Sequence, residues 1–235
     1  MNIVVTGASK GIGKAIVFAF AKDKTPHRFF ICARNESCLK TLKHEVEAEY
    51  PQHEVNIFSC DMADKNDVQA FAVFIQDKIH AADVLINNAG IYFPGSCYNE
   101  EDGVLEKMLE VNLLSAYRLT RALLPGMMQI RKGQVFNLCS IASLQAYANG
   151  GSYSISKFAL AGFTKNLREE LQAHNIRVTS ISPGPTLTAS WEGFEAPPGR
   201  MMPPEDIASV VWSAWSLAPQ TVIEEILLRP MLGDF

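Results

Sequence analysis

The sequence has little of what a nucleic-acid binder or a membrane protein requires. Its 235 residues carry 21 Lys and Arg against 25 Asp and Glu, a formal net charge of −4. A nucleic-acid-binding face needs an excess of basic side chains to neutralise phosphates. No apolar run approaches the roughly 20 residues of a membrane-spanning helix. We therefore expect neither a nucleic-acid nor a membrane partner.

Cysteine and histidine are too few and too scattered to indicate a disulfide framework or a metal site. The five cysteines are an odd number without a CxxC pair, and the five histidines show no HxxxH spacing. Cys32, Cys60 and Cys139 fall in or beside apolar strand-like runs, where a thiol acts as a small buried hydrophobe. We expect no disulfide and no metal, and we expect the histidines at solvated helix ends and loops.

The first residues bear on the location of the protein. Residues 2–5 (NIVV) are typical of a buried strand, and a glycine turn follows at once. A secretory leader would need a basic segment, an apolar segment and a cleavage site, for which these residues leave no room. We expect a cytoplasmic protein.

Short apolar runs alternate with longer amphipathic stretches along the whole chain. Strands are expected at 2–6, 28–33, 54–59, 82–87, 133–139, 176–182 and 222–228. Helices are expected at 11–22, 35–49, 64–80, 99–129, 151–174 and 204–217. Continuous apolar strands are buried on both faces, as in a parallel sheet, and strict alternation favours right-handed crossovers. The prediction is an α/β, Rossmann-type, doubly wound sheet of about seven parallel strands, with helices on both faces.

Helix boundaries and one irregular segment complete the outline of a single domain, residues 1–235. Asp64 and the run 203–205 are helix starts, and Pro125-Gly126 is expected to bend or end the long stretch 99–129, which has room for two helices. The segment 183–203 holds five prolines together with large apolar side chains. We interpret 185–203 as a substrate lid, the alternative being a loop packed on the core.

The turn after the first strand predicts a nucleotide site. The run 6–13 (TGASKGIG) lies between the expected strand and a helix. Glycines allow a sharp turn and a close approach of the backbone to a pyrophosphate. The following helix N-terminus offers unpaired N–H groups and the positive end of its dipole.

With its spacing of TGxxxGxG, this turn resembles the glycine motif of the short-chain dehydrogenase/reductase family. The run 87–90 (NNAG) and the run 153–157 (YSISK) resemble later motifs of that family in order and spacing, and the resemblance covers essentially the whole chain. It implies hydride transfer between a nicotinamide cofactor and a carbonyl carbon. The residues that it assigns to the cofactor are Gly7, Ser9, Lys10, Gly11, Ile12, Gly13, Arg34, Asp61, Met62, Asn88, Ala89, Gly90, Tyr153, Lys157, Pro183, Gly184, Thr186 and Thr188.

The end of the second strand indicates which nicotinamide cofactor is used. Arg34 stands where an acidic residue would accept hydrogen bonds from a ribose 2′-hydroxyl, and a guanidinium suits a 2′-phosphate instead. Lys10 adds a second positive charge, although Glu36 lies nearby and both cations could simply be surface residues. We predict NADP(H).

Four residues resemble the catalytic set of the family. Tyr153 and Lys157 are four residues apart on one helix face, and a cation near a phenol lowers its pKa. The resemblance makes Tyr153 the general acid/base and Lys157 the residue that tunes it and holds the nicotinamide ribose. Ser140 would hydrogen-bond the substrate oxygen, with Ser143 the lesser candidate. Asn112 would hold a water that relays protons to the lysine.

The substrate is less well defined. Segments 92–97, 141–150 and 185–203 should form an aromatic pocket suited to a flat or apolar carbonyl compound, in which Ser140, Tyr147 and Trp191 are substrate candidates. Residues 201–208 and 222–230 and the closing Gly233-Asp234 resemble the bacterial sepiapterin reductases within the family. That resemblance implies reduction of a pterin side-chain ketone, although no acid that could anchor a pterin closely follows the Pro183-Gly184 turn.

Three alternatives remain, together with an expectation about assembly. The alternatives are a 3-oxoacyl-thioester reductase, a broad ketone or diketone reductase, and a non-catalytic NADP sensor.

The family commonly forms homodimers or homotetramers, here through 99–129 and 151–174 or through the last helix and strand. Ala159, Ala161 and Gly162 allow close packing of one helix face, which could also rest on this chain's own sheet.

Overall fold

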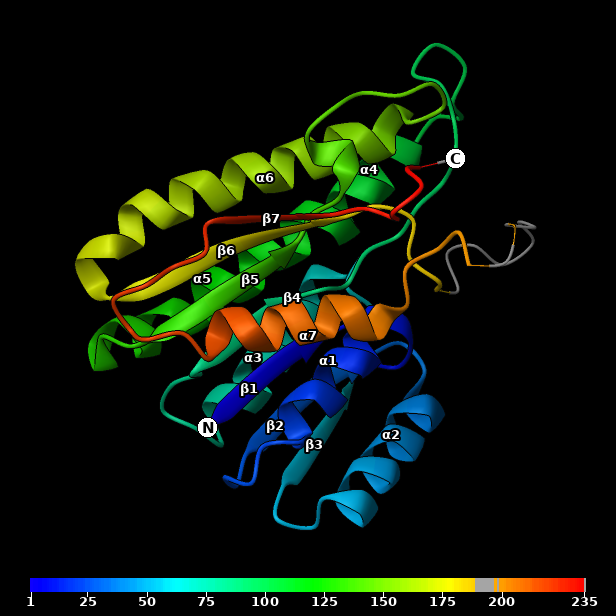
Figure 1. Cartoon of the computed structure of the whole chain (residues 1–235). Coiled ribbons are helices and arrows are strands. Elements are labelled where there is room, and N and C mark those ends of the chain that lie inside the picture. The colour runs from blue at the N-terminus through cyan, green and yellow to red at the C-terminus, as the bar shows by residue number, and fades with distance from the viewer. Residues whose placement is uncertain (189–196, 198, 235) are drawn as a thin grey trace.

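The computed structural model describes residues 1–188, 197 and 199–234. Its centre is a seven-stranded sheet in the order β3-β2-β1-β4-β5-β6-β7, with all neighbouring strands parallel. The strands are β1 (Asn2–Thr6), β2 (Arg28–Ala33), β3 (Glu54–Ser59), β4 (Val84–Asn87), β5 (Gly133–Leu138), β6 (Ile176–Pro183) and β7 (Glu225–Leu228). This confirms the expected fold class (Figure 1).

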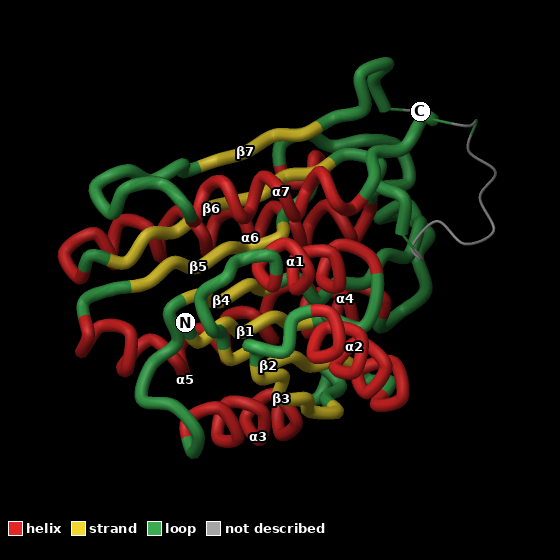
Figure 2. Tube along the Cα trace, turned by 60° about the horizontal axis from the view of Figure 1, so that its bottom comes forward, coloured by secondary structure: helices red, strands yellow, loops and turns green. Residues whose placement is uncertain are grey.

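Helices cover both faces of the sheet, because the central strands are apolar on both sides. One apolar cluster joins the sheet to α1 (Gly11–Ala21), α2 (Glu36–Glu49) and α7 (Pro204–Trp215). A second cluster joins it to α3 (Lys65–Gln76), α5 (Ser115–Ile130) and α6 (Gly151–Leu171). Figure 2 shows the two layers on either side of the strands.

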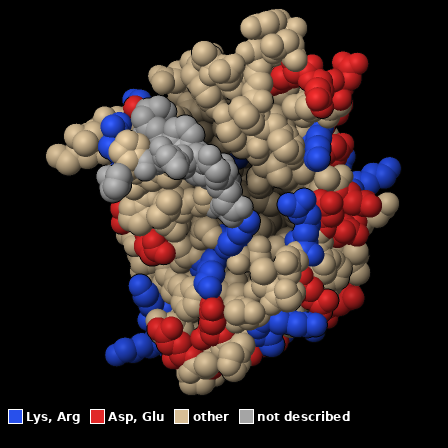
Figure 3. Space-filling view, turned by 90° about the vertical axis from the view of Figure 1, so that its right-hand side faces the viewer, with Lys and Arg blue, Asp and Glu red and all other residues tan. Residues whose placement is uncertain are grey.

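The topology places a crevice at one end of the sheet. β1 pairs with β2 on one side and with β4 on the other, so the order of the strands reverses at this point. Ligands of open parallel sheets bind outside the carboxyl ends of the strands at such a reversal. The face at this end is hollowed, and Lys and Arg side chains lie near the hollow (Figure 3).

The structure corrects the expected break in the helical stretch 99–129. The helix passes through Pro125, which lies inside α5, and the break lies earlier. There α4 (Val104–Leu109) and α5 are joined by the π-helical turn η1 (Glu110–Leu114). Gly126 has a packing role, since a Cβ on it would lie 2.4 Å from the carbonyl oxygen of His80. The prediction of two helices was right, but the position of the break was wrong.

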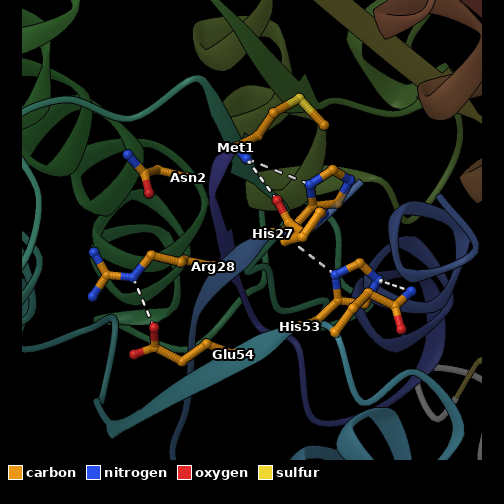
Figure 4. A pocket seen from close by; sticks show the side chains of 8 residues that line it. Met1, Asn2, His27, Arg28, His53 and Glu54 are labelled. Atoms are coloured by element: carbon orange, nitrogen blue, oxygen red, sulfur yellow. Dashed lines mark hydrogen bonds and ion pairs between the residues drawn. The ribbon is translucent and has the colours of Figure 1, made fainter. Parts of the chain in front are cut away.

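The expectation for the histidines was wrong at two positions. His27 and His53 are 1% and 5% exposed, respectively, and their rings stack with centroids 5.0 Å apart. His53 Nδ1 accepts the N–H of His27, and its Nε2 lies 2.8 Å from the carbonyl oxygen of Ala21. Figure 4 shows both rings beside Met1, in a pocket at the end of the sheet opposite the crevice. The His53 ring exchanges solvent for backbone partners, which makes its burial tolerable, whereas the His27 ring lies between the N-terminal ammonium and the Asp23 carboxylate.

The remaining boundaries agree with the expectations to within a few residues. Asp64 caps α3 by accepting the N–H of Asn66, and α7 begins at Pro204. The free thiols of Cys32, Cys60 and Cys139 are buried. Among the described residues, no helix is long and apolar enough to cross a membrane.

Candidate active site

The glycine turn brings the backbone of β1 against the start of α1. Gly7 and Gly11 adopt φ values of +64° and +56°, which favour glycine. A Cβ on Gly13 would lie 2.4 Å from the carbonyl oxygen of Gly7. Among the described side chains none caps the first N–H groups of α1, whose N-cap residue is Lys10. Ser9 and Ile12 complete the turn, which fits a pyrophosphate group in shape and in polarity.

The NNAG segment lies directly on this turn. Asn88 Nδ2 donates to the carbonyl oxygens of Thr6 and Gly7, at 2.8 and 3.1 Å, respectively. A Cβ on Gly7 would lie 2.9 Å from Cα of Ala89, so the two segments are in backbone contact. Gly90 continues the segment toward Asn112 and Lys157, whose side-chain atoms lie 3.3 and 3.5 Å from the position of a Cβ on that glycine. The predicted cofactor turns are therefore adjacent.

Arg34 and Asp61 follow the ends of the neighbouring strands β2 and β3. The side chain of Arg34 is exposed, as is that of Lys10, so both cations can reach a phosphate in the crevice. The Asp61 carboxylate accepts the N–H of Ala63. Met62 is buried, and its sulfur accepts hydrogen bonds from the thiols of Cys32 and Cys60, with sulfur–sulfur distances of 3.8 and 3.5 Å, respectively. Met62 therefore offers a ligand its backbone only.

Tyr153 and Lys157 lie on one face of the first turns of α6. Lys157 Nζ lies 5.8 Å from the centroid of the Tyr153 ring and donates to the carbonyl oxygen of Leu138 at 2.7 Å. Ser140 follows β5, and its hydroxyl hydrogen-bonds the Tyr153 side chain. That hydroxyl also accepts the N–H of Ala142, which fixes the start of the 3-10 turn η2 (Ile141–Ser143). Three of the four expected catalytic side chains thus meet at the carboxyl end of β5.

The electrostatics of this cluster differ from the expectation. Burial raises the pKa of the Tyr153 phenol, and the hydrogen bond from Ser140 opposes that rise. Burial lowers the pKa of Lys157 to about 8, opposed by the nearby Cys139 thiol. In this structure the ammonium is bonded to the Leu138 carbonyl rather than to the phenol, and Lys157 is 4% exposed. We expected Lys157 to lower the pKa of Tyr153, but in this structure the pKa of Tyr153 is raised.

Asn112 lies in the π-helical turn η1 and links three elements. Its Oδ1 accepts the N–H of Ile91 at 2.8 Å, while its Nδ2 donates to the Ile91 carbonyl and to Ser156 Oγ. All of its polar atoms are paired, which offsets the cost of burying an amide at 1% exposure. A π-helical turn widens a helix locally and is frequent at functional sites. Here it turns Asn112 toward α6 and brings it near Lys157.

Ser143, the lesser catalytic candidate, has a structural role. Its hydroxyl accepts the N–H of Ser140, so that the two serines form a reciprocal cap of the turn. Because Ser143 is 4% exposed and faces this backbone, Ser140 is the better placed of the two for a substrate oxygen.

The segment after β6 closes the crevice from the other side. Thr186 Oγ1 donates to the carbonyl oxygen of Gly184, and Cγ2 of Thr188 lies 3.1 Å from the position of a Cβ on Gly11. The ends of the expected lid pair with each other, since Met202 N–H donates to Pro185 and Leu187 N–H to Met202. The turn that begins at Pro183 therefore lies beside the glycine turn, as its expected cofactor contacts require.

One group near the substrate side, Asp234, was not predicted as a site residue. The carboxylate of Asp234 lies against the Pro183-Gly184 turn, with Oδ1 2.8 Å from the position of a Cβ on Gly184. Asp234 Oδ2 pairs with Arg229, whereas Oδ1 is buried with no hydrogen-bond partner among the described residues. No acid closely follows this turn in the sequence, but the folded chain brings one to it from the C-terminal end (Figure 1).

Tyr92, in the predicted pocket segment 92–97, joins two residues that the sequence placed in the site. Its ring packs edge-on against Tyr153 with centroids 4.9 Å apart, and its hydroxyl is hydrogen-bonded to Tyr147. The burial of Tyr147 raises the pKa of its phenol. Trp191, the third substrate candidate, lies outside the described residues.

Comparison of the sequence with known proteins identifies the family to which this arrangement of residues belongs. A model of the short chain dehydrogenase family matches residues 1–197. The chain belongs to this family. A sepiapterin reductase of Chlorobaculum tepidum is 31% identical over 99% of this chain and 97% of its own length.

Two solved structures of similar fold were determined with NADP-type cofactors. An alcohol dehydrogenase of Thermococcus sibiricus, complexed with 5-hydroxy-NADP, has a TM-score of 0.90 and 26% identity, covering 98% of this chain and 96% of that one. The L-sorbose reductase of Gluconobacter frateurii, complexed with NADPH and L-sorbose, has a TM-score of 0.89 and 27% identity, covering 97% and 95%.

Proposed function

We propose that this oxidoreductase uses NADP(H) to reduce a side-chain ketone of a pterin. The cofactor, when bound, supplies the hydride that reaches the carbonyl carbon. The observation that carries the chemistry is the meeting of Tyr153, Lys157 and Ser140 at the carboxyl end of β5. The same end of the sheet holds the glycine turn and Arg34, which suit the pyrophosphate and the 2′-phosphate.

The protein groups divide the work of stabilising and protonating the developing alkoxide. The Ser140 hydroxyl donates a hydrogen bond to the carbonyl oxygen, and the Tyr153 hydroxyl gives that oxygen its proton. A phenol with a raised pKa remains protonated at neutral pH, as the reduction requires. Lys157 holds the nicotinamide ribose hydroxyls, and its charge then favours the phenolate that proton transfer leaves behind. Asn112 keeps the proton path to Lys157 in place.

Two observations support a pterin as the substrate. The relative from Chlorobaculum tepidum is named a sepiapterin reductase and aligns along almost the entire chain. The unpaired carboxylate oxygen of Asp234 also supports a pterin, because it can accept hydrogen bonds from the N–H groups of such a ring. The aromatic rings of Tyr92 and Tyr147 suit a flat heterocycle.

The substrate assignment is tested by following NADPH oxidation with sepiapterin and, separately, with a small diketone that has no ring N–H groups. Asp234→Asn should raise KM for sepiapterin about tenfold and leave the diketone unchanged, because a charge-assisted hydrogen bond contributes ~1.5–3 kcal/mol. Glu205→Gln, at an exposed acid in the first turn of α7, is the matched control. If sepiapterin gives no turnover while the diketone is reduced, the pterin proposal fails and the reductase chemistry stands.

A broader ketone reductase is the second candidate. The similar structures from Thermococcus sibiricus and Gluconobacter frateurii are named an alcohol dehydrogenase and an L-sorbose reductase, respectively. Equal kcat/KM values for diketones, sugars and sepiapterin would favour this function.

A 3-oxoacyl-thioester reductase ranks lower. An acyl-carrier substrate would favour a basic patch at the mouth of the pocket, and Arg200 is the one clear cation of the lid sequence. A non-catalytic NADP sensor also ranks lower, because it would not require the four residues Asn112, Ser140, Tyr153 and Lys157.

We also propose a homodimer or homotetramer that assembles through α5 and α6. Ile155 and Phe158 are each 44% exposed on α6, and Tyr117 is 39% exposed on α5. A Cβ on Gly162 would meet nothing within 4 Å, so this small residue faces outward rather than onto the chain's own sheet. An exposed apolar face with a small residue permits close packing of a second copy. Phe158→Glu should reduce the molar mass in light scattering, whereas a mass already monomeric in the wild type would contradict the proposal.

A further inference from the structure

The first turn of α6 lacks a cap from its own sequence, although it carries Tyr153. Its N-cap residue is Gly150, which has no side chain, and the turn continues through Gly151 and Ser152 to Tyr153. The first N–H groups of a helix need partners from elsewhere, and helix ends fray when none is supplied. The position of the proton donor therefore depends on what holds this turn.

A carboxylate from a distant segment fills that role. Glu100, which lies between β4 and α4, accepts the backbone N–H of Ser152 through Oε1 at 2.9 Å. Its Oε2 accepts the hydroxyl of the same serine. A negative charge at this position is also favoured by the helix dipole. Figure 1 shows the segment before α4 beside the amino end of α6.

Two glycines make the room that this carboxylate occupies. The position of a Cβ on Gly95 lies 2.6 Å from Cγ of Glu100 and 2.9 Å from its Oε1. A Cβ on Gly151 would come within 1.9 Å of that Oε1, and Gly151 has a φ of +28°. Any larger residue at either position would displace the Glu100 side chain. Gly95, Gly151 and Ser152 thus form a socket for Glu100.

Further contacts tie the same two segments together around Tyr153. Gly95 N–H donates to the carbonyl oxygen of Asn149, and Ser96 Oγ donates to Oδ1 of that residue at 2.9 Å. Tyr92, from the segment of Glu100, packs against the Tyr153 ring. Segment 92–100 therefore holds Tyr153 in two ways: Tyr92 packs against the ring of Tyr153, and Glu100 binds the helix backbone at the preceding residue.

We infer that Glu100 is a positioning residue for catalysis, which fixes the Tyr153 hydroxyl through Ser152 and the socket of Gly95 and Gly151. The inference rests on the proposed role of Tyr153 but not on the identity of the substrate. Misplacement of a catalytic group by about 1 Å can cost up to 100-fold in rate. Loss of the carboxylate should therefore slow the chemical step with little effect on NADPH binding, because the glycine turn after β1 and Arg34 after β2 do not depend on Glu100.

The first test compares substitutions of Glu100 in the full-length protein with a diketone that the wild type reduces. Glu100→Ala should lower kcat about tenfold, and Glu100→Asp should resemble it because its carboxylate is one methylene short of the serine. Glu100→Gln should recover at least a third of the wild-type kcat, since its amide oxygen can accept the N–H of Ser152 and its NH2 group can donate to the serine hydroxyl oxygen. Glu101→Ala, at the exposed neighbouring acid, is the control, and the Kd for NADPH should stay the same in every variant.

The deuterium isotope effect on kcat, measured with NADPH deuterated at the transferred hydrogen, separates positioning from stability. If Glu100 positions Tyr153, hydride transfer becomes more rate-limiting in Glu100→Ala and the isotope effect rises toward its intrinsic value. A loss of folded enzyme alone would lower kcat with the isotope effect unchanged, and that result would overturn the inference.

A double-mutant cycle gives the second test. The three atoms nearest to a Cβ on Gly95 all belong to Glu100, and the backbone of Gly95 does not adopt a positive φ. Gly95→Ala should therefore lower kcat in the wild type but have no further effect in Glu100→Ala. If the two substitutions lower kcat additively in the double variant, the proposed socket is contradicted. Tyr153→Phe is assayed in parallel: if it stays active, the proposed catalytic role fails, whereas an inactive Tyr153→Phe beside fully active Glu100 variants refutes this inference alone.

Discussion

Thr6 and Asn88 bind each other's backbone across the β1–β4 boundary. Thr6 Oγ1 accepts the N–H groups of Asn88 and Ala89, both at 3.0 Å, while Asn88 Nδ2 returns a hydrogen bond to the Thr6 carbonyl oxygen. The two side chains thereby join the glycine turn to the NNAG turn. Both turns belong to the proposed cofactor site, and these hydrogen bonds set their relative position without a ligand.

Removal of the Asn88 amide should weaken cofactor binding. Asn88→Ala leaves the carbonyl oxygens of Thr6 and Gly7 without their partner and loosens the contact between the turns. We expect a destabilisation of ~1–3 kcal/mol and a Kd for NADPH raised about tenfold. Calorimetric titration and thermal unfolding check both values. Asn66→Ala, at the exposed start of α3, is the control, and an unchanged Kd for Asn88→Ala would contradict the assigned role.

Arg34 should decide the choice between NADPH and NADH. A charge-assisted hydrogen bond to a phosphate contributes ~1.5–3 kcal/mol, so Arg34→Ala should raise KM for NADPH about 10- to 100-fold. KM for NADH, which has no 2′-phosphate, should change little. The ratio of the two kcat/KM values measures the effect. Arg28→Ala, whose guanidinium pairs with Glu54 at the opposite end of the sheet, is the matched control. Equal losses with both cofactors would exclude a 2′-phosphate contact.

The alkaline limb of the pH profile should report Lys157. Burial lowers the pKa of Lys157 to about 8, so the ammonium loses its proton as the pH rises through that value. Reduction needs both the protonated phenol and the charged lysine, and kcat/KM at saturating NADPH should fall above about pH 8. Lys157→Arg keeps its charge at higher pH and should remove this limb, at the cost of a lower rate. A profile that stays level to about pH 10 would contradict the assignment.

His27 should make the fold sensitive to mild acid. Burial, and next the N-terminal ammonium, lower the pKa of His27 below its ordinary value of 6.5, opposed by Pro26 and Asp23. The unfolded chain therefore takes up a proton that the folded chain resists, and stability is lost as the pH falls below 6.5. His27→Phe keeps a ring against His53 without the titration.

The measurement for His27 is Tm as a function of pH between about 5 and 7. The fall in Tm of the wild type over this range should be shallower in His27→Phe. His44→Gln, which changes an exposed histidine of α2, should follow the wild type. Identical acid limbs for His27→Phe and the wild type would show that other groups cause the acid sensitivity.

The sequence predicted the fold and the chemistry to the extent that each depends on local pattern. Apolar runs gave strands β1 and β2 with the bounds expected, because strands buried on both faces leave continuous apolar sequences. The bounds of β3, an edge strand, were also as expected. The TGxxxGxG spacing located the turn before α1 because glycine is required at fixed backbone positions. Tyr153 and Lys157 were found because a helix brings residues four apart onto one face.

Features that depend on distant contacts could not be predicted in this way. Pro125 has the sequence signal of a helix end, yet α5 continues through it because the packing of the helix outweighs local preference. Tyr92 lies in the predicted pocket segment 92–97, but the sequence did not specify its contact with Tyr153. Glu100 and Asp234 were not predicted as site residues, and only the folded chain brings them to Ser152 and Gly184. The burial of His53 likewise depends on backbone partners from other segments.

The central claim is that Tyr153 donates the proton in an NADPH-dependent carbonyl reduction, and Tyr153→Phe tests it most directly. The substitution removes one hydroxyl and keeps the ring that packs against Tyr92. NADPH oxidation with a diketone or sepiapterin should fall at least 100-fold, because general acid catalysis contributes roughly 10²–10⁴ in rate, while the Kd for NADPH stays within about twofold. Retained turnover in a variant that still binds NADPH would contradict the account.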